Sequence, residues 1–444
     1  MRTPIVDFVR AYAEKNALRL HMPGHKGKGA LGIEALDLTE IEGADSLYEA
    51  EGIIKESEEN ASKLFGCKTY YSTEGSSLCI RAMLYLLTLY AREKGVRAHV
   101  LAGRNAHKTF LSACAMLDTE VTWLSGDKKS YLSCSVSPLE LKKAISSAPV
   151  KPIAVYITSP DYLGNVSDVK ALAEICHAHG VLLCVDNAHG AYLRFLTPSL
   201  HPIDLGADIC CDSAHKTLPV LTGGAYLHLT RNCPNVFSEC AKDALATFGS
   251  TSPSYLILQS LDAANEYLAN GYTERLYEFS LLVSECKNEL MAHGYTFVGD
   301  EPLKLTVKTK PYGYSGYGFA DILKRNGIVS EFADPDYTVL MLTPEIGEEG
   351  LDRLTDVMKN IPMIAPVTDE TPSPVKLKQS LSIREAYLSP SETLPISECV
   401  GRTLARATVG CPPAVPIAVS GEIIDEAALK AFEYYNIKTC TVVK

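Results

Sequence analysis

The sequence predicts an α/β fold: a mostly parallel sheet flanked by helices, followed by a smaller α+β domain and a C-terminal segment. From about residue 55 to residue 230, strand-like and helix-like segments alternate, which is typical of parallel strands joined by helical crossovers. The run Val181-Leu182-Leu183-Cys184-Val185 is apolar throughout, as expected of a strand buried on both faces of a sheet. The 444 residues are enough for two or three domains.

Hydrophobic periodicity and turn residues predict the elements of the first half. Residues 77–93 form a strong helix, because Leu78, Ala82 and Leu86 share one face. Residues 169–178 form another, which ends before Gly180. The remaining expectations are helices at 4–15 and 54–65 and strands at 68–72, 98–102, 120–124, 152–158, 181–185, 208–212 and 225–229.

A long helical stretch at 254–292 is expected to connect this domain to a smaller one. The smaller domain has predicted strands at 303–309 and 337–342 and predicted helices at 317–326 and 350–360. Residues 362–376 are rich in proline, threonine and charged residues, which predicts a linker, and a helix and a strand are expected near the end of the chain. The predicted division is an N-terminal arm (1–35), a large cofactor-binding domain (36–260), a small α+β domain (261–365) and a C-terminal domain (366–444).

Composition excludes several classes of protein. The net charge of −11 argues against a broad nucleic-acid surface. No apolar run is long enough to span a bilayer, and the first residues do not resemble a signal-peptide core, so we expect a cytoplasmic protein without a membrane partner. The fourteen cysteines lack paired metal-ligand spacing and are expected to be reduced and buried.

Two other kinds of site are disfavoured by the sequence. His177 and His179 lie two residues apart on a predicted helix and therefore point in different directions, so no metal site is expected there. No Gly-x-Gly-x-x-Gly turn follows a strand, which argues against a dinucleotide-binding enzyme.

A lysine and an acid follow two apolar strands, and this pair points to pyridoxal phosphate. Asp186 ends the strand at 181–185, and Lys216 stands thirty positions later in Ser213-Ala214-His215-Lys216-Thr217. A lysine amine can form an imine with the cofactor aldehyde, and an acid can keep the pyridine nitrogen protonated. Either residue alone could be an ordinary surface lysine or ion-pair partner. Their joint placement after strands that end at one sheet edge favours the cofactor.

The segment Thr73-Glu74-Gly75-Ser76-Ser77 is a candidate phosphate site at the start of the strong helix. Backbone N–H groups there and the hydroxyls of Ser76 and Ser77 suit a phosphate, and Gly75 permits close approach, although serines at a helix start are often simple caps. Ser213 and His215 are natural further donors. His107, which follows a predicted strand, could stack on a pyridine ring or be an ordinary loop histidine.

In several ordered motifs the sequence resembles the bacterial ornithine/lysine/arginine decarboxylases, in the short form without an N-terminal wing domain. The resemblance covers nearly the whole chain. The motifs are His21-Met22-Pro23-Gly24-His25-Lys26-Gly27, Asn105-Ala106-His107-Lys108, Asp186-Asn187-Ala188-His189-Gly190-Ala191, Ser213-Ala214-His215-Lys216-Thr217-Leu218, Ser250-Thr251-Ser252-Pro253-Ser254-Tyr255, Val400-Gly401-Arg402 and Cys411-Pro412-Pro413-Ala414-Val415-Pro416. It implies pyridoxal-phosphate fold type I, like that of aspartate aminotransferase.

The resemblance also implies a role for each site residue. Lys216 carries the cofactor, Asp186 binds its pyridine nitrogen and His107 stacks on its ring. His189 lies near the ring, and Gly75, Ser76, Ser77, Ser213 and His215 hold the phosphate. Ser250 or Thr251 reaches the phosphate of a neighbouring subunit in a homodimer with shared active sites, which can assemble further. Glu331 is the candidate for the basic end of the substrate, and Lys216 or His215 returns the proton.

Three positions depart from the usual pattern of that family. Asn187 stands where glutamate is usual, Ala414 stands where glycine is usual, and Thr222-Gly223-Gly224-Ala225 replaces a version that contains glutamine. None of them removes the lysine, the acid or the phosphate donors.

The expected reaction is decarboxylation of a basic amino acid, arginine first and then lysine or ornithine, to CO2 and agmatine, cadaverine or putrescine, which are polyamine precursors. An aminotransferase or aldolase of the same fold would share Lys216 and Asp186. An aminotransferase would also need an arginine for the substrate's α-carboxylate, for which Arg402 and Arg406 are candidates. A catalytically silent paralogue that serves as a binding subunit is the third alternative.

Overall fold

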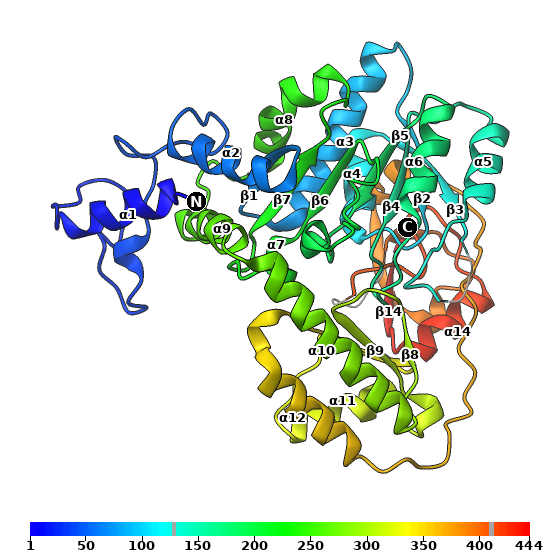
Figure 1. The fold of residues 1–444 in the computed structure, drawn as a ribbon. Helices are drawn as coiled ribbons and strands as arrows, with labels where there is room; N and C mark the ends of the chain where they lie inside the picture. The colour runs from blue at the N-terminus through cyan, green and yellow to red at the C-terminus, as the bar shows by residue number, and fades with distance from the viewer. Residues whose placement is uncertain (127–129, 408–412) are drawn as a thin grey trace. The chain divides into compact units, whose positions relative to one another are not determined.

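A computed structural model of the chain describes residues 1–126, 130–407 and 413–444 (Figure 1). Cys411 and Pro412 of the last motif lie outside these residues. The chain divides into two compact units, Met1–Val96 with Leu182–Arg275, and Arg97–Val181 with Leu276–Lys444. Its strands form a seven-stranded sheet in the order β1-β7-β6-β5-β4-β2-β3, a four-stranded sheet β10-β11-β9-β8 and a three-stranded sheet β12-β14-β13.

The first unit carries four strands of the large sheet and the helices that cover them. Its elements are α1 (Pro4–Glu14), α2 (Ile53–Phe65), β1 (Lys68–Ser72), α3 (Gly75–Glu93), β5 (Leu182–Asp186), β6 (Ile209–Asp212), α7 (Ala214–Thr217), β7 (Ala225–Leu229), α8 (Asn235–Phe248) and α9 (Tyr255–Ala269). Strands β5 and β6 are parallel, whereas β7 runs antiparallel to both β6 and β1. The predicted sheet is therefore confirmed as mostly parallel, with β7 reversed.

The second unit carries the other three strands of the large sheet and both smaller sheets. Strand β2 is parallel to both β3 and β4. Its elements are β2 (His99–Gly103), α4 (Lys108–Leu117), β3 (Glu120–Leu124), α5 (Pro138–Ser147), β4 (Ala154–Thr158), α6 (Val169–Ala178), β8 (Phe297–Val298), β9 (Lys304–Lys308), α11 (Gly316–Arg325), β10 (Phe332–Ala333), β11 (Tyr337–Met341), α12 (Gly347–Lys359), α13 (Ile383–Leu388), β12 (Ser391–Pro395), β13 (Leu404–Arg406), α14 (Glu426–Tyr434) and β14 (Thr439–Val443).

The expected single helical stretch at 254–292 is two helices. Helix α9 ends at Ala269 and α10 (Tyr272–Ala292) begins three residues later. Gly271 between them has a φ of +73°, a left-handed conformation that glycine adopts without steric cost. The chain can therefore change direction between the two helices.

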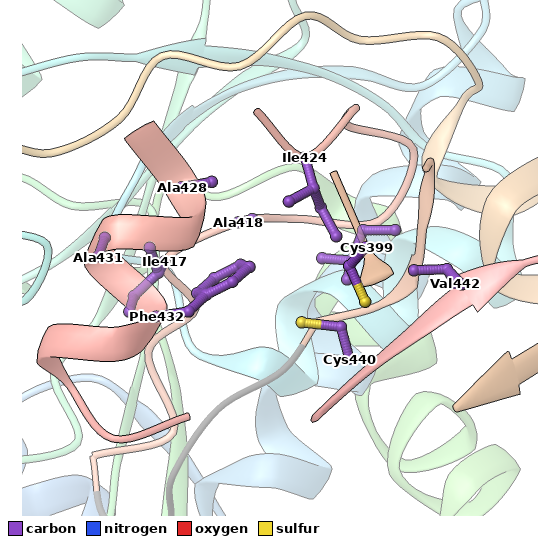
Figure 2. Packing of buried hydrophobic residues seen from close by; sticks show 10 residues of the cluster. Cys399, Ile417, Ala418, Ile424, Ala428, Ala431, Phe432, Cys440 and Val442 are labelled. Atoms are coloured by element: carbon purple, nitrogen blue, oxygen red, sulfur yellow. The ribbon is translucent and has the colours of Figure 1, made fainter. Parts of the chain in front are cut away.

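A compact hydrophobic cluster organises the end of the chain. Figure 2 shows Phe432 of α14 among Ile417, Cys399 and Cys440, all of them buried. Packing of this aromatic ring joins α14 to the sheet of β12, β13 and β14. The expected terminal helix and strand are confirmed.

The cysteines behave as the composition predicts. Those in the described part of the chain are thiols rather than disulfides, and all of them except Cys233 and Cys240 are buried. Among the described residues, no helix combines the length and apolar character needed to cross a bilayer. The predicted division of the chain into four parts remains a prediction.

Candidate active site

Asp186 and Lys216 follow neighbouring parallel strands in the first unit. Asp186 is the last residue of β5, is 2% exposed and pairs in register with Cys211 of β6. Lys216 lies in the short helix α7, which begins directly after Ser213 at the end of β6. Because β5 and β6 run in the same direction, both residues emerge at the same edge of the sheet.

His189 links the segment after β5 to the lysine. Its Nε2 lies 3.0 Å from Lys216 Nζ, and the imidazole is 5% exposed. The turn after β5 presents this side chain: Asp186 Oδ1 accepts the N–H of Ala188 at 3.3 Å, and the carbonyl of Asn187 accepts the N–H of Gly190 at 2.8 Å. His189 therefore contacts the lysine directly, while its expected position near the cofactor ring remains a prediction.

The candidate phosphate loop lies between β1 and α3. The structure starts the helix at Gly75, two residues earlier than the sequence predicts, so Gly75, Ser76 and Ser77 form its first turn. Ser213 Oγ donates to Ser76 Oγ at 2.7 Å, which brings together hydroxyls from the end of β6 and the start of α3. The N-cap residue Glu74 makes no side-chain hydrogen bond to the helix start, so an anion could use the N–H groups there.

Gly223 and Gly224, directly before β7, accept hydrogen bonds from the candidate phosphate loop and from the segment that carries Lys216. The N–H of Gly75 donates to the carbonyl of Gly223 at 2.7 Å. His215 donates to the carbonyl of Gly224 twice, from its backbone N–H at 3.1 Å and from its ring Nδ1 at 3.0 Å. Since a carbonyl oxygen only accepts, the ring carries a hydrogen on Nδ1.

Gly223 is required for this close approach. Its φ is +102°, and a Cβ there would lie 2.8 Å from the carbonyl oxygen of Thr73. A larger residue would force the loop before α3 away from the start of β7.

Ser250 and Thr251 are exposed after the end of α8. The N–H of Ser250 donates to the carboxylate of Glu74 at 2.5 Å, so this segment lies beside the N-cap of α3 in its own chain. A contact with the phosphate of a neighbouring subunit remains a prediction.

His107 and Glu331 are the two predicted site residues that belong to the second unit. His107 is the N-cap of α4, and its Nδ1 accepts the N–H of Thr109 at 3.1 Å. Glu331 Oε1 accepts a hydrogen bond from the hydroxyl of Tyr162 at 2.8 Å. The stacking role of His107 and the substrate role of Glu331 remain predictions.

A buried polar network around Asp212 was missed by the sequence reasoning. Asp212 Oδ1 accepts from Asn187 Nδ2 at 2.7 Å, and Oδ2 accepts from His201 Nε2 and from His228 Nε2, both at 3.1 Å. All four residues are fully buried. Asp212 ends an apolar strand just as Asp186 does, and this position is the feature of the sequence that could have pointed to the network.

The network keeps Asp212 ionised. Burial by itself raises the pKa of Asp212, but the two histidines and their hydrogen bonds outweigh burial and hold that pKa below its usual range. Burial lowers the pKa of His228 despite its acidic neighbour, which favours the neutral imidazole. Three buried donors thus compensate the charge of Asp212 in a dry core.

Ligand atoms of His201, Cys210 and Asp212 lie within 4.8 Å of one another, a spacing that a metal ion could use. The hydrogen bonds to Asp212 account for this grouping. Burial also raises the pKa of the Cys210 thiol well above its usual value, so it stays protonated rather than becoming a thiolate ligand.

A cavity of about 620 Å³ in the second unit contains none of the predicted site residues. Arg97, His99, Thr119, Trp123 and Arg384 are among the residues that line it, beside the edge strand β3. Its charged side chains are largely engaged already, because Arg97 pairs with Asp118 and Glu120.

The residues of the first unit fit pyridoxal phosphate. The cofactor needs a lysine for its aldehyde, an acid for its ring nitrogen and a donor set for its phosphate. Lys216 and Asp186 emerge at one sheet edge, and the joined hydroxyls of Ser76 and Ser213 lie at the start of a 19-residue helix. The chemistry of this donor set matches a phosphate monoester.

Comparison with known proteins identifies the family of the chain. A profile of the family described as "Orn/Lys/Arg decarboxylase, major domain" matches residues 3–298, more than half of the chain. The arginine decarboxylase of Halalkalibacterium halodurans is 29% identical over 96% of this chain and 92% of its own length. The arginine decarboxylase of Bacillus subtilis is 28% identical over 96% of this chain and 91% of its own.

Solved structures share the fold. The lysine decarboxylase of Francisella novicida superposes with a TM-score of 0.79 at 17% identity, covering 100% of this chain and 81% of its own. Together with the profile match, these results show that the chain belongs to the ornithine/lysine/arginine decarboxylase family and is a pyridoxal-phosphate-dependent amino-acid decarboxylase.

Proposed function

We propose that this enzyme decarboxylates arginine in preference to lysine or ornithine and produces agmatine. The observation that carries the catalytic assignment is the 3.0 Å contact between Lys216 Nζ and His189 Nε2, at the sheet edge where Asp186 ends β5. The substrate assignment rests on the arginine decarboxylases among its relatives, which align over nearly their whole length. Family membership favours decarboxylation over the aminotransferase or aldolase alternative.

Within this proposal the cofactor is held from three sides. Lys216 attaches its aldehyde, and the carboxylate of Asp186 binds its ring nitrogen. The start of α3 holds its phosphate: Ser76, Ser77 and Ser213 donate from their hydroxyls, Gly75 permits close approach, and His215 donates from Nε2 when its ring is protonated. His107 stacks on its ring. When bound, pyridoxal phosphate supplies a π system that accepts the electron pair released as CO2 departs.

The protein's own groups then control protons. Asp186 is 2% exposed, and an anion in that position keeps a proton on the ring nitrogen. His189 orients the amine of Lys216 through their hydrogen bond. Lys216 or His215 returns a proton to the substrate carbon after CO2 has left.

Glu331 binds the basic end of the substrate in this proposal. Tyr162 donates to one carboxylate oxygen of Glu331 and is itself 8% exposed, so it can fix the orientation of the acid. Glu331→Gln should raise KM for arginine about tenfold or more, because a charged hydrogen bond is lost, with a smaller effect on kcat. An equal KM in the variant would remove Glu331 from the substrate site.

We further propose a cytoplasmic homodimer, with Ser250 or Thr251 reaching the neighbouring active site, and a role for the amine product as a polyamine precursor. Ser250 and Thr251 are exposed after α8, which supports a contact with a neighbouring subunit. Size-exclusion chromatography with light scattering should give twice the chain mass of 48.2 kDa or a multiple of it. A monomer that is fully active would contradict the shared site.

The decisive experiment is CO2 release from arginine, lysine and ornithine, measured side by side with purified protein and added pyridoxal phosphate. We expect a yellow protein that is most active with arginine, and Lys216→Ala should abolish both colour and activity. Lys15→Ala, an exposed lysine after α1, is the matched control and should change neither.

Other outcomes would assign a different function. Amino-group exchange with a keto acid without CO2 release would identify an aminotransferase. A folded, colourless protein would support the silent paralogue. A yellow, active Lys216→Ala variant would overturn the assignment of the lysine.

A further inference from the structure

Asn187 and Asp212 join the two segments that carry the acid and the lysine. Asn187 directly follows Asp186, and Asp212 lies four residues before Lys216. The amide Nδ2 of Asn187 donates to Asp212 Oδ1 at 2.7 Å, and the backbone N–H of Asn187 donates to the carbonyl of Cys211 at 2.9 Å. These two bonds connect the ends of β5 and β6, together with the thiol of Cys211, which donates to Asp186 Oδ1 at 3.7 Å.

Asp212 is itself fixed from the other side. His228, on β7, donates its Nε2–H to Asp212 Oδ2, and its Nδ1 lies 2.9 Å from the hydroxyl of Thr69 on β1. His201 donates to the same carboxylate oxygen. Since a carboxylate only accepts, these donors leave Asp212 Oδ1 facing the amide of Asn187.

The amide of Asn187 can donate a hydrogen bond to the carboxylate of Asp212, whereas a carboxylate at position 187 could not. An ionised acid there could donate nothing, and two carboxylates at hydrogen-bond distance in a dry core cannot both stay ionised. The resemblance gives glutamate as the usual residue at this position. In this chain the amide donates without needing a proton, so Asp212 can remain an anion.

We propose that Asn187 and Asp212 are a positioning pair that fixes the Asp186 carboxylate relative to Lys216. The pair acts through the backbone of the residues next to it and does not touch the reacting atoms. This inference rests on the roles of Asp186 and Lys216 given under Proposed function.

The test uses the full-length protein and a reciprocal exchange. Asn187→Asp removes the donor and places a second acid against Asp212. We expect pyridoxal phosphate to bind about tenfold or more weakly, because a hydrogen bond to an ionised group is lost, with an altered visible spectrum of the bound cofactor. The double variant N187D/D212N restores an amide-to-carboxylate bond in the opposite direction and should recover most of the affinity and the spectrum.

Asn265→Asp is the matched control. Asn265 is also fully buried in the first unit, and its Nδ2 donates to Tyr71 Oη at 2.7 Å and to the carbonyl of Ser57 at 3.0 Å. The same substitution there should lower the unfolding temperature of the cofactor-free protein while leaving cofactor affinity and spectrum unchanged. If Asn187→Asp does not fold, Asn187→Ala removes the donor without adding charge and should weaken cofactor binding in the same direction.

Three results would overturn the inference. One is an Asn187→Asp variant that loses thermal stability as the control does but binds the cofactor with unchanged affinity and spectrum. The second is a double variant no better than the worse single variant. The third is a stoichiometric metal ion that Asp212→Asn removes. The variants could also change cofactor binding as expected while the unmodified protein has no decarboxylase activity. That result would support the positioning pair and would contradict the proposed reaction.

Discussion

Ala414 adopts a backbone conformation that glycine normally occupies. Its φ is +57°, it is 2% exposed, and its carbonyl accepts the N–H of Lys108, the first residue of α4. A left-handed conformation costs an L-residue roughly 1–2 kcal/mol. This position is also one of those where the sequence departs from the glycine usual in the family it resembles.

Ala414→Gly should therefore stabilise the protein by about 0.5–1 kcal/mol, since relief of the strain exceeds the entropy that glycine adds to the unfolded chain. Chemical denaturation measures this difference. Ala418→Gly, four residues later in the hydrophobic cluster and at negative φ, should instead destabilise the protein by about 1 kcal/mol. A loss of stability in both variants would show that Ala414 is not strained.

At the scale of elements, an acid from α9 fixes the start of α1. The N-cap residue Thr3 makes no side-chain capping bond. Instead Asp262 Oδ2 accepts the N–H groups of Ile5 at 2.8 Å and Val6 at 3.0 Å, and its Oδ1 accepts from Ser57 at 2.5 Å. A carboxylate at a helix N-terminus satisfies unpaired N–H groups and interacts favourably with the helix dipole.

Asp262→Ala should release α1 and lower the free energy of unfolding by about 2–4 kcal/mol, because two buried N–H groups lose a charged acceptor. Amide hydrogen exchange over α1 would report the release directly. Asp262→Asn keeps an oxygen that can accept from both groups and should retain most of the protection. Equal exchange in the alanine variant and the unmodified protein would contradict this tether.

At the scale of the whole molecule, each unit buries an acid whose pKa is raised. Burial raises the pKa of Asp262 in the first unit to about 6 and that of Asp334 in the second unit to about 7. Asp334 is 2% exposed, and its Oδ1 accepts the N–H groups of Asp336 and Tyr337. At a pH between the unfolded value, near 3.8, and the folded one, the folded state binds more protons than the unfolded state.

The contribution of these acids to stability is therefore complete below about pH 4 and is lost as the pH rises through about 6 for Asp262 and about 7 for Asp334. Asp334→Asn removes the titration and keeps the accepting oxygen. Its free energy of unfolding relative to the unmodified protein should rise between pH 5 and pH 8, by at most about 3 kcal/mol. Denaturation at several pH values measures the difference. A difference that does not vary with pH would mean that Asp334 is ionised throughout.

Much of the sheet could be predicted because its strands are short apolar runs. The bounds of β1, β3 and β7 match the expectation at both ends, and β5 is shifted by one residue. The inner strands β5 and β7 have a clear local pattern because they are buried along nearly their whole length, which favours apolar side chains. The edge strands β1 and β3 also have exposed or half-buried positions. Helices α4, α5 and α8 were not predicted; their starts depend on caps such as His107 and Ser137, which look like ordinary loop residues in sequence.

The edge of the sheet at which the lysine, the acid and the candidate phosphate loop lie could be predicted because each follows a strand, whereas their roles toward a cofactor remain predictions. The network around Asp212 could not, because it depends on strand order. His228 reaches Asp212 only because β7 lies between β1 and β6, and spacing along the chain does not reveal that insertion. His201 comes from an irregular segment, whose position no periodicity indicates.

Strand β7 runs antiparallel to both of its neighbours, and this affects which substitutions the residues before it can tolerate. A strand that runs against both neighbours begins where they end, so the residues before it lie between the loop after β1 and the segment after β6. There the main-chain carbonyls of Gly223 and Gly224 hold the candidate phosphate loop and the segment of Lys216, beside the hydrogen bond between the hydroxyls of Ser213 and Ser76. Tolerance to mutation should therefore fall sharply from position 222, whose side chain takes no part in these hydrogen bonds, to position 223.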